Sequence, residues 1–258
     1  MKPVRIVQCA DSVEGILTAV YDAWAMKYGH EFIKLQVIGM EESVNYELFS
    51  EYVLVEPNTD KADKVARSIQ KKISNQVYGL VVKAALSNDP RKADAIYHFL
   101  VRGFLIGKGV VDHLSDPYVQ QIFEMNRFVG NETHFFKGFL RFVELKNGIL
   151  LGKMEPKSNI LELLTPHFAD RFAGENFMIV DMKRGIAAIH EKNREWFMTA
   201  FDEDQMEALA VYDEQENEYS VLWKAFFKSV AIKERENQDL QRNQVHIRYR
   251  KYMTEFEK

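Results

Sequence analysis

FVELKNGILLGKM, residues 142–154, marks the point at which the sequence changes from helical to extended patterns. Asn147-Gly148 suits a type I′ turn, and the runs on either side alternate between apolar and polar residues, which is typical of a β-hairpin. Helical spacing of apolar residues is common before this stretch, and short strand patterns are common after it. The sequence therefore predicts an α+β protein that is mostly helical and has β-hairpins in its second half.

The first half predicts a small N-terminal sheet followed by helices. Val4–Val7 alternates as a short strand, and two further strands are expected at 32–38 and 52–55. Apolar spacing and turn residues predict helices at about 12–27, 59–73, 75–87, 91–106 and 117–142. The expected capping residues are Asp11 or Ser12 for the first of these helices and Thr59 or Asp60 for the second.

The second half predicts further strands and ends in a long amphipathic helix. A short helix is expected from Asn159, with a helical turn that restarts at Thr165-Pro166, and strands are expected at 177–181, 185–190 and 196–201. The chain then forms a single domain of residues 1–258 with a soft division near residue 142. In the final helix, six apolar residues share one stripe and are expected in the core: Tyr219, Leu222, Trp223, Phe226, Phe227 and Val230.

The composition excludes several classes of protein. Hydrophobic residues make up 47% of the 258 residues, which is the balance of a folded protein. Because no apolar run approaches the roughly 18–20 residues that cross a bilayer and the first residues lack a secretory signal, we expect a cytoplasmic protein without a membrane contact. Cys9 is the only cysteine, so an internal disulfide, an iron–sulfur cluster or a cysteine-rich zinc site cannot form within the chain. No resident cofactor is predicted.

The charges are separated along the sequence although the net charge is only −4. Residues 201–218 contain eight acidic residues and no Lys or Arg, whereas residues 224–251 contain eight basic residues against three acidic ones. Such separation produces local fields that the net charge conceals. The acidic segment could dock a basic partner, and the basic segment could contact an acidic one.

A basic string with an aromatic residue inside it lies near the C-terminus. Arg248, Arg250 and Lys251 could neutralise phosphates, and Tyr249 between them could stack on an unpaired base. The alternative is that Tyr249 packs inward and the cations are solvated. If the second half folds together, the cations Arg171 and Arg184 would join this nucleic-acid contact.

Three residues are candidates for catalysis. His167 and Asp170 are three residues apart in a predicted helical turn, so they share a face and could relay a proton or bind a metal, with Asp181 as a third member. The alternative is that Asp170 pairs with Arg171 or Arg184 and that His167 forms a local hydrogen bond. No His-Glu-x-x-His pattern occurs, so a dedicated metal site is not predicted.

Several strings resemble one bacterial family across nearly the whole chain. They are Glu14–Val20, Gly138–Phe142, Pro166–Phe172, Asp181 with Arg184-Gly185, and the ending from Tyr219 through Arg248-Tyr249. The family consists of DNA-metabolism or DNA-repair proteins of unassigned function, encoded beside a radical S-adenosylmethionine (SAM) protein, and its domain is also found fused to uracil-DNA glycosylase-like domains. The resemblance implies a role on DNA, single-stranded or damaged, beside a radical SAM partner that carries the cluster. It assigns no catalytic residue.

The sequence departs from the family pattern at a few positions. Cys9-Ala10-Asp11-Ser12 stands where the family's opening usually reads like Tyr-Asp-Gly-Ser. Phe135 stands where a basic residue is common in the family. His246 and Arg250 replace the common Pro and Trp. These differences leave the roles of the opening loop and of position 135 open.

Three functions follow as hypotheses. The first is a nucleic-acid-binding accessory protein that works with a radical SAM partner in DNA metabolism or repair. The second is a hydrolytic enzyme on nucleic acid that uses His167 and Asp170. The third is a non-catalytic interaction module that docks through its acidic segment at 201–218.

Overall fold

The computed structural model describes residues 2–40, 47–145, 148–202, 204–206, 245, 247–253 and 256. These residues form two compact units, 1–131 and 132–258, which we describe separately. The boundary between the units lies at residues 131 and 132, whereas the sequence suggested a soft division near 142. The predicted final helix with its stripe at 219–230 lies outside the described residues, as do all but a few residues of the acidic segment.

Unit 1 contains a parallel sheet of three strands in the order β2-β1-β3. They are β1 (Val4–Cys9), β2 (Ile33–Val37) and β3 (Ser50–Leu54), which confirms the predicted N-terminal sheet. Val7 lies opposite Leu35 in β2 and opposite Val53 in β3, so these apolar residues share one face of the sheet. Helices pack on this face and bury it.

The chain leaves β1 through a tight loop that ends in α1 (Val13–Ala25). The Ser12 side chain accepts a hydrogen bond of 2.9 Å from the backbone N–H of Gly15, which confirms one of the two predicted caps. A Cβ atom on Gly15 would lie only 2.6 Å from the carbonyl oxygen of Ala10. Glycine is therefore required where the helix begins beside the loop.

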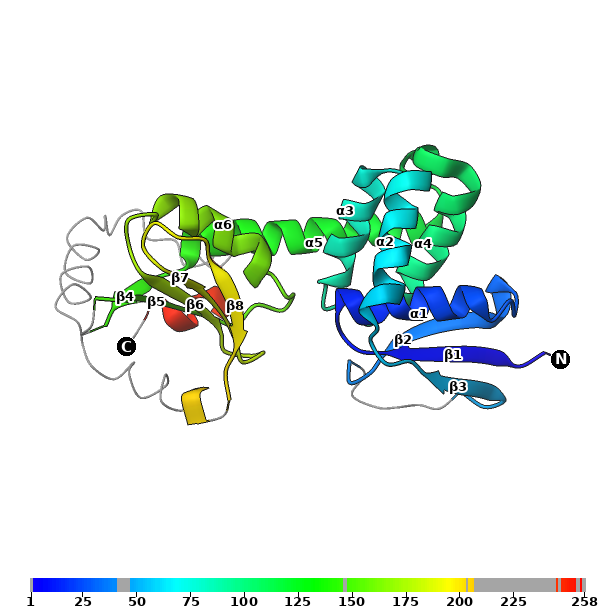
Figure 1. Ribbon diagram of the computed structural model, residues 1–258, viewed down its shortest axis with the longest axis horizontal. Helices are drawn as coiled ribbons and strands as arrows, with labels where there is room; N and C mark the ends of the chain where they lie inside the picture. The colour runs from blue at the N-terminus through cyan, green and yellow to red at the C-terminus, as the bar shows by residue number, and fades with distance from the viewer. Residues whose placement is uncertain are drawn as a thin grey trace, which may run out of the picture. The chain divides into compact units, whose positions relative to one another are not determined.

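Four further helices belong wholly or partly to unit 1. They are α2 (Thr59–Lys72), α3 (Asn75–Ala85), α4 (Lys92–Ile106) and α5 (Pro117–Phe139), with short 3-10 turns η1 (His30–Phe32) and η2 (Gly107–Asp112). Helix α1 packs on β1 and β2, and α2 packs on α1 (Figure 1). The cap of α2 is Asn58 and not the predicted Thr59 or Asp60, because the Asn58 side chain accepts the Lys61 N–H at 3.0 Å.

Unit 2 is built on a mixed sheet of five strands in the order β4-β5-β6-β7-β8. The predicted hairpin is confirmed by the antiparallel pair β4 (Phe142–Glu144) and β5 (Leu150–Met154). The predicted strands of the following region are β6 (Phe177–Asp181), β7 (Ile186–His190) and β8 (Phe197–Ala200). The sequence did not predict that β5 and β6 pair in parallel and join the two hairpins into one sheet.

Helix α6 (Leu161–Arg171) provides the crossover that parallel pairing requires. The predicted restart at Thr165-Pro166 is wrong, because one helix continues through Pro166. The Thr165 hydroxyl donates a 2.7 Å hydrogen bond to the Leu161 carbonyl and supports the helix at this point. The Phe168 ring packs edge-on against Phe142 of the sheet, with ring centroids 5.0 Å apart.

Within the part of the chain that the structure describes, no helix is both long enough and apolar enough to cross a bilayer.

Candidate functional site

Asp181 is the last residue of β6, directly before the turn to β7, and has no exposed surface. One carboxylate oxygen accepts the backbone N–H groups of Lys183 and Arg184 at 3.0 and 3.2 Å, and the other accepts the Arg184 guanidinium at 2.7 Å. The same guanidinium also donates to the carbonyls of Pro156 and Lys157. Both predicted site residues are therefore engaged in holding this turn.

His167 and Asp170 lie on α6, where Asp170 is exposed and His167 is half-buried. Burial lowers the pKa of His167, and the nearby cations Lys137 and Arg171 lower it further, against an opposing effect of Asp170. His167 and Asp170 therefore lie near each other on α6, as the three-residue spacing predicted. Among the described residues, however, no three His, Cys, Asp or Glu side chains are grouped so that they could hold a metal ion.

The predicted nucleic-acid contact near the C-terminus forms the 3-10 turn η5 (Ile247–Tyr252). Tyr249 is only 5% exposed, and its ring packs against those of Phe135, Phe136 and Phe139 at centroid distances of 5.5, 5.1 and 5.7 Å. This arrangement fits the inward-packed alternative for Tyr249. Phe135, at a position where the family pattern favours a basic residue, is therefore one of the three rings that pack around Tyr249.

The cations of η5 have partners within unit 2. Arg248 donates to the Tyr249 hydroxyl at 2.5 Å and lies 3.7 Å from the carboxylate of Glu132, which is buried and also accepts the backbone N–H groups of Lys157 and Ser158. Lys251 forms an ion pair with Glu155.

Arg250 lies with its guanidinium 4.5 Å from the centre of the Phe256 ring, and it donates to the Val245 carbonyl. Arg171 is exposed, with its guanidinium 5.7 Å from the Phe172 ring. Of the six predicted nucleic-acid residues, Arg171, Arg248 and Lys251 are exposed.

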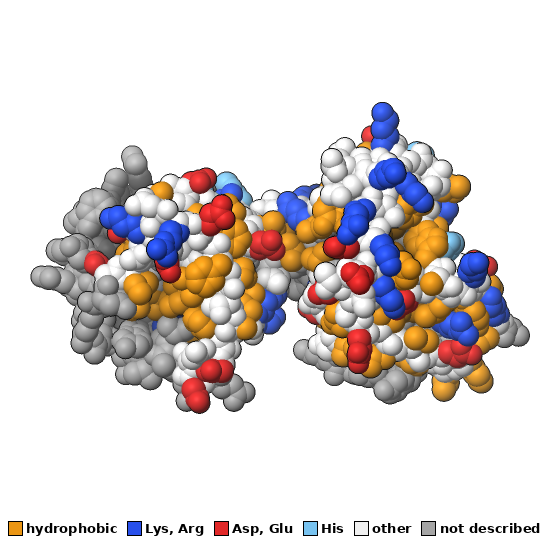
Figure 2. Space-filling view, in the orientation of Figure 1, with side chains coloured by type: hydrophobic (Ala, Val, Ile, Leu, Met, Phe, Trp, Pro, Cys, Tyr) orange, Lys and Arg blue, Asp and Glu red, His pale blue; other side chains and the backbone are white. Residues whose placement is uncertain are grey.

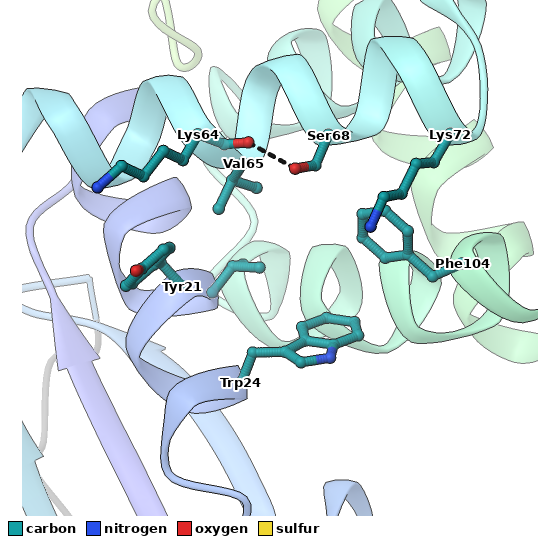
Figure 3. Close-up of a pocket in the computed structure, with 8 residues that line it drawn as sticks. Tyr21, Trp24, Lys64, Val65, Ser68, Lys72 and Phe104 are labelled. Atoms are coloured by element: carbon teal, nitrogen blue, oxygen red, sulfur yellow. Dashed lines mark hydrogen bonds between the residues drawn. The ribbon is translucent and has the colours of Figure 1, made fainter.

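Unit 1 contains a different candidate, which we call the α2 groove. It is a pocket of about 350 Å³ between α1, α2 and α4 (Figure 3). Its lining residues are Val20, Tyr21 and Trp24 of α1, Lys64, Val65, Ser68 and Lys72 of α2, and Phe104 of α4.

The floor of the α2 groove is aromatic and firmly supported. The Trp24 ring packs edge-on against Phe104 and Tyr97, with centroids 5.3 and 5.6 Å away. Tyr97 is fully buried, and its hydroxyl lies 2.6 Å from Nδ1 of His30. Burial raises the pKa of the Tyr97 phenol, so this hydroxyl stays protonated and available for the hydrogen bond. The indole of Trp24 is therefore held in one position.

The rim of the α2 groove is cationic. Lys64 and Lys72 extend from α2 on either side of Ser68, whose hydroxyl donates to the Lys64 carbonyl at 2.7 Å (Figure 3). Among the residues that the structure describes, neither lysine has a carboxylate partner. Helix α2 contains five basic residues against two acidic ones, and Lys and Arg side chains gather over this face of unit 1 with hydrophobic side chains between them (Figure 2).

An aromatic floor beneath unneutralised cations can bind a planar group that carries negative charge. A ring stacks on the indole, and anionic oxygens contact the ammonium groups. The alternative is a surface hollow filled by water, with lysines that only keep the protein soluble. The rigid indole and the spacing of the two lysines on one helix face favour the ligand-binding interpretation.

The α2 groove was not predicted from the sequence. Trp24 and Phe104 are 80 positions apart, so only the packing of α4 on α1 brings them together. The one local signal was the spacing of Lys64, Ser68 and Lys72 at four-residue intervals, which places three polar side chains on one stripe of a helix.

Comparison with known proteins gives a family match and a distant structural likeness. The family model described as a domain of unknown function, DUF4130, matches residues 90–255, which is more than half of the chain. A search of curated proteins finds no match. Among solved structures, the chain is similar to a DHH-domain protein that is described as a member of a family of ribosomal proteins. The identity is 12%, the similarity covers 89% of this chain and 80% of that one, and the TM-score is 0.32. A likeness at that level carries no argument.

Proposed function

The chain belongs to the DUF4130 family, whose description names no activity, and we propose that it is a nucleic-acid-binding protein of DNA metabolism that acts as an accessory to a radical SAM partner. The α2 groove is the observation that carries the binding part of this proposal. It lies mostly outside the residues that the family model matches, since only Phe104 of its lining falls within 90–255.

Charge supports nucleic acid as the ligand. Phosphates would contact Lys64 and Lys72 without first breaking an ion pair, because neither lysine has a carboxylate partner among the described residues. By contrast, Lys61 of the same helix is held 2.7 Å from Asp22, and Arg67 is held 3.2 Å from Asp63. A phosphate would have to displace a carboxylate from either of those. We therefore assign the main contact to the two groove lysines.

The partner follows from the family resemblance together with the cysteine count. A chain with one cysteine cannot hold the cluster of radical SAM chemistry. In this proposal the partner carries out the reaction and the present chain supplies affinity for the nucleic acid. Co-purification of the two proteins with and without a bound oligonucleotide tests this part. A partner whose nucleic-acid affinity is unchanged by this chain would contradict it.

The binding part is tested by titrating a labelled strand of about 20 nucleotides, followed by fluorescence anisotropy between about 50 and 200 mM salt. The wild-type affinity should fall as salt rises, because phosphate contacts release counterions. The double variant K64A/K72A should bind at least about tenfold more weakly and flatten the logarithmic salt slope by about 1.4, that is about 0.7 for each lost contact on a single strand. Alanine favours helix, so the fold is retained.

Lys71→Ala is the matched control. Lys71 is an exposed cation on the same helix that does not line the groove. It should change the affinity by less than about twofold. Equal losses in K71A and in K64A/K72A would show that the helix attracts nucleic acid only through its overall charge, and absence of binding at the lowest salt concentration would overturn the proposed function.

A further inference from the structure

We propose that the α2 groove binds one unpaired base of a single strand, stacked on Trp24, while the strand's phosphates contact Lys64 and Lys72. This inference rests on the proposed function and names its ligand. It makes the protein selective for single-stranded over double-stranded nucleic acid.

The floor of the groove favours a base over a simple anion. Tyr21, Trp24 and Phe104 present three rings around one hollow, and an anion alone would leave their apolar surface without a partner (Figure 3). Because Trp24 is already fixed by Phe104 and Tyr97, little freedom is lost when a base stacks on it. Every base has a flat face, so such stacking does not depend on sequence.

The size of the groove favours a single base. A volume of about 350 Å³ lies at the lower end of the range for small-ligand pockets. In a duplex the bases are paired and stacked inside, so a duplex could reach the two lysines with its phosphates but could not fill the hollow between them. The single strand therefore gains a contact that the duplex lacks.

The spacing of the lysines sets the length of strand that is contacted. Lys64 and Lys72 are eight residues apart on one stripe of α2, which corresponds to about 12 Å along the helix axis. At about 3.4 Å per stacked nucleotide this distance is spanned by about three to four nucleotides. The carboxylate partners of Lys61 and Arg67 keep the contact from extending along the rest of the helix.

Ser68 lies between the two lysines and can read a polar edge of the base. Its hydroxyl hydrogen is committed to the Lys64 carbonyl, so its oxygen is left to accept a hydrogen bond. A base that offers an amino or imino hydrogen toward α2 would satisfy it. The Tyr21 hydroxyl and the Trp24 indole N–H are the other polar side-chain groups of the lining besides the ammonium groups.

The experiment compares oligothymidylates of about two to ten nucleotides with a duplex of equal charge, and follows both anisotropy and intrinsic tryptophan fluorescence. We expect affinity to rise steeply up to about four nucleotides and only slightly beyond. The single strand, but not the duplex, should quench the emission of Trp24. A Trp196→Phe variant removes a tryptophan of unit 2 and should leave this quenching intact. A polyglutamate of the same charge should bind at least about tenfold more weakly than the strand, and equal binding would overturn the inference.

Trp24→Leu should weaken single-strand binding by about 5- to 150-fold, the range of one lost base–aromatic stack, and leave duplex binding unchanged. Tyr21→Leu removes a half-buried ring from the same hollow and serves if Trp24→Leu lowers the melting temperature. If both variants fold and bind single strands as the wild type does, the base does not enter the groove, and the inference is overturned although nucleic-acid binding through the lysines stands. If the wild type binds neither form, the proposed function itself fails.

Discussion

Replacing Tyr249 by alanine distinguishes the two roles that the sequence allowed for this residue. The structure gives Tyr249 an exposed fraction of 5%, ring contacts with Phe135, Phe136 and Phe139, and a 2.5 Å hydrogen bond from Arg248 to its hydroxyl. Truncation of a buried aromatic side chain costs about 3–5 kcal/mol of unfolding free energy. Tyr249→Phe keeps the ring and loses only the hydroxyl contact, which is worth about 1 kcal/mol.

Urea denaturation followed by near-ultraviolet circular dichroism measures both losses, and a single-strand titration is run on the same samples. A buried anchor predicts a large loss of stability for Tyr249→Ala, a small one for Tyr249→Phe, and unchanged affinity of the folded fraction. A stacking residue predicts the reverse, with stability retained and about 1–3 kcal/mol of single-strand affinity lost. That second pattern would refute the reasoning from burial and restore the C-terminal contact.

Three further predictions concern buried polar groups. Asp181→Asn should lower the unfolding free energy by about 3 kcal/mol, as measured by thermal or urea denaturation, because it leaves the Arg184 guanidinium without its anion. Retained stability together with a lost activity would instead indicate a catalytic role for Asp181. Glu132→Gln should lower the unfolding free energy by about 1.5–3 kcal/mol in the same assay, because the charged acceptor of two backbone N–H groups is removed. Arg248→Met should lower the unfolding free energy by less than Glu132→Gln does. Burial raises the pKa of the Cys9 thiol to about 12. At about pH 8, iodoacetamide should therefore alkylate the native protein more than about a thousandfold more slowly than the urea-unfolded protein. A comparable rate for the two would show that the thiol is accessible.

Local signals in the sequence predicted most of the described elements. A side chain that caps a helix, such as Ser12, and a turn that closes a hairpin act within a few residues, so their patterns can be recognised without knowledge of the fold. The parallel pairing of β5 with β6 could not be predicted in this way, because it depends on how α6 packs across the sheet. The continuity of α6 through Pro166 was missed for a similar reason, since packing of Phe168 on the sheet overrides the local preference of proline for a break.

The candidate site was less predictable than the fold. The sequence identified Asp181 and Arg184 as chemically capable groups, but it could not show that the turn itself uses both of them. It placed Tyr249 among cations without showing which way the ring points. The α2 groove depends on Trp24 and Phe104, which only the tertiary structure brings together.

Whether a cation already has a partner decides between the two basic regions as binding surfaces. Lys251 and Arg248 lie beside the carboxylates of Glu155 and Glu132, so a phosphate that binds either of them must compete with an anion already in place. The cost of losing that anion cancels most of the gain from the phosphate, because the two contacts are of the same kind. Lys64 and Lys72 face no such competition among the described residues, and they stand above aromatic surface that a base can cover. A string of basic and aromatic residues therefore indicates a nucleic-acid contact only when the structure leaves its charges unneutralised, and in this protein α2 meets that condition better than η5 does.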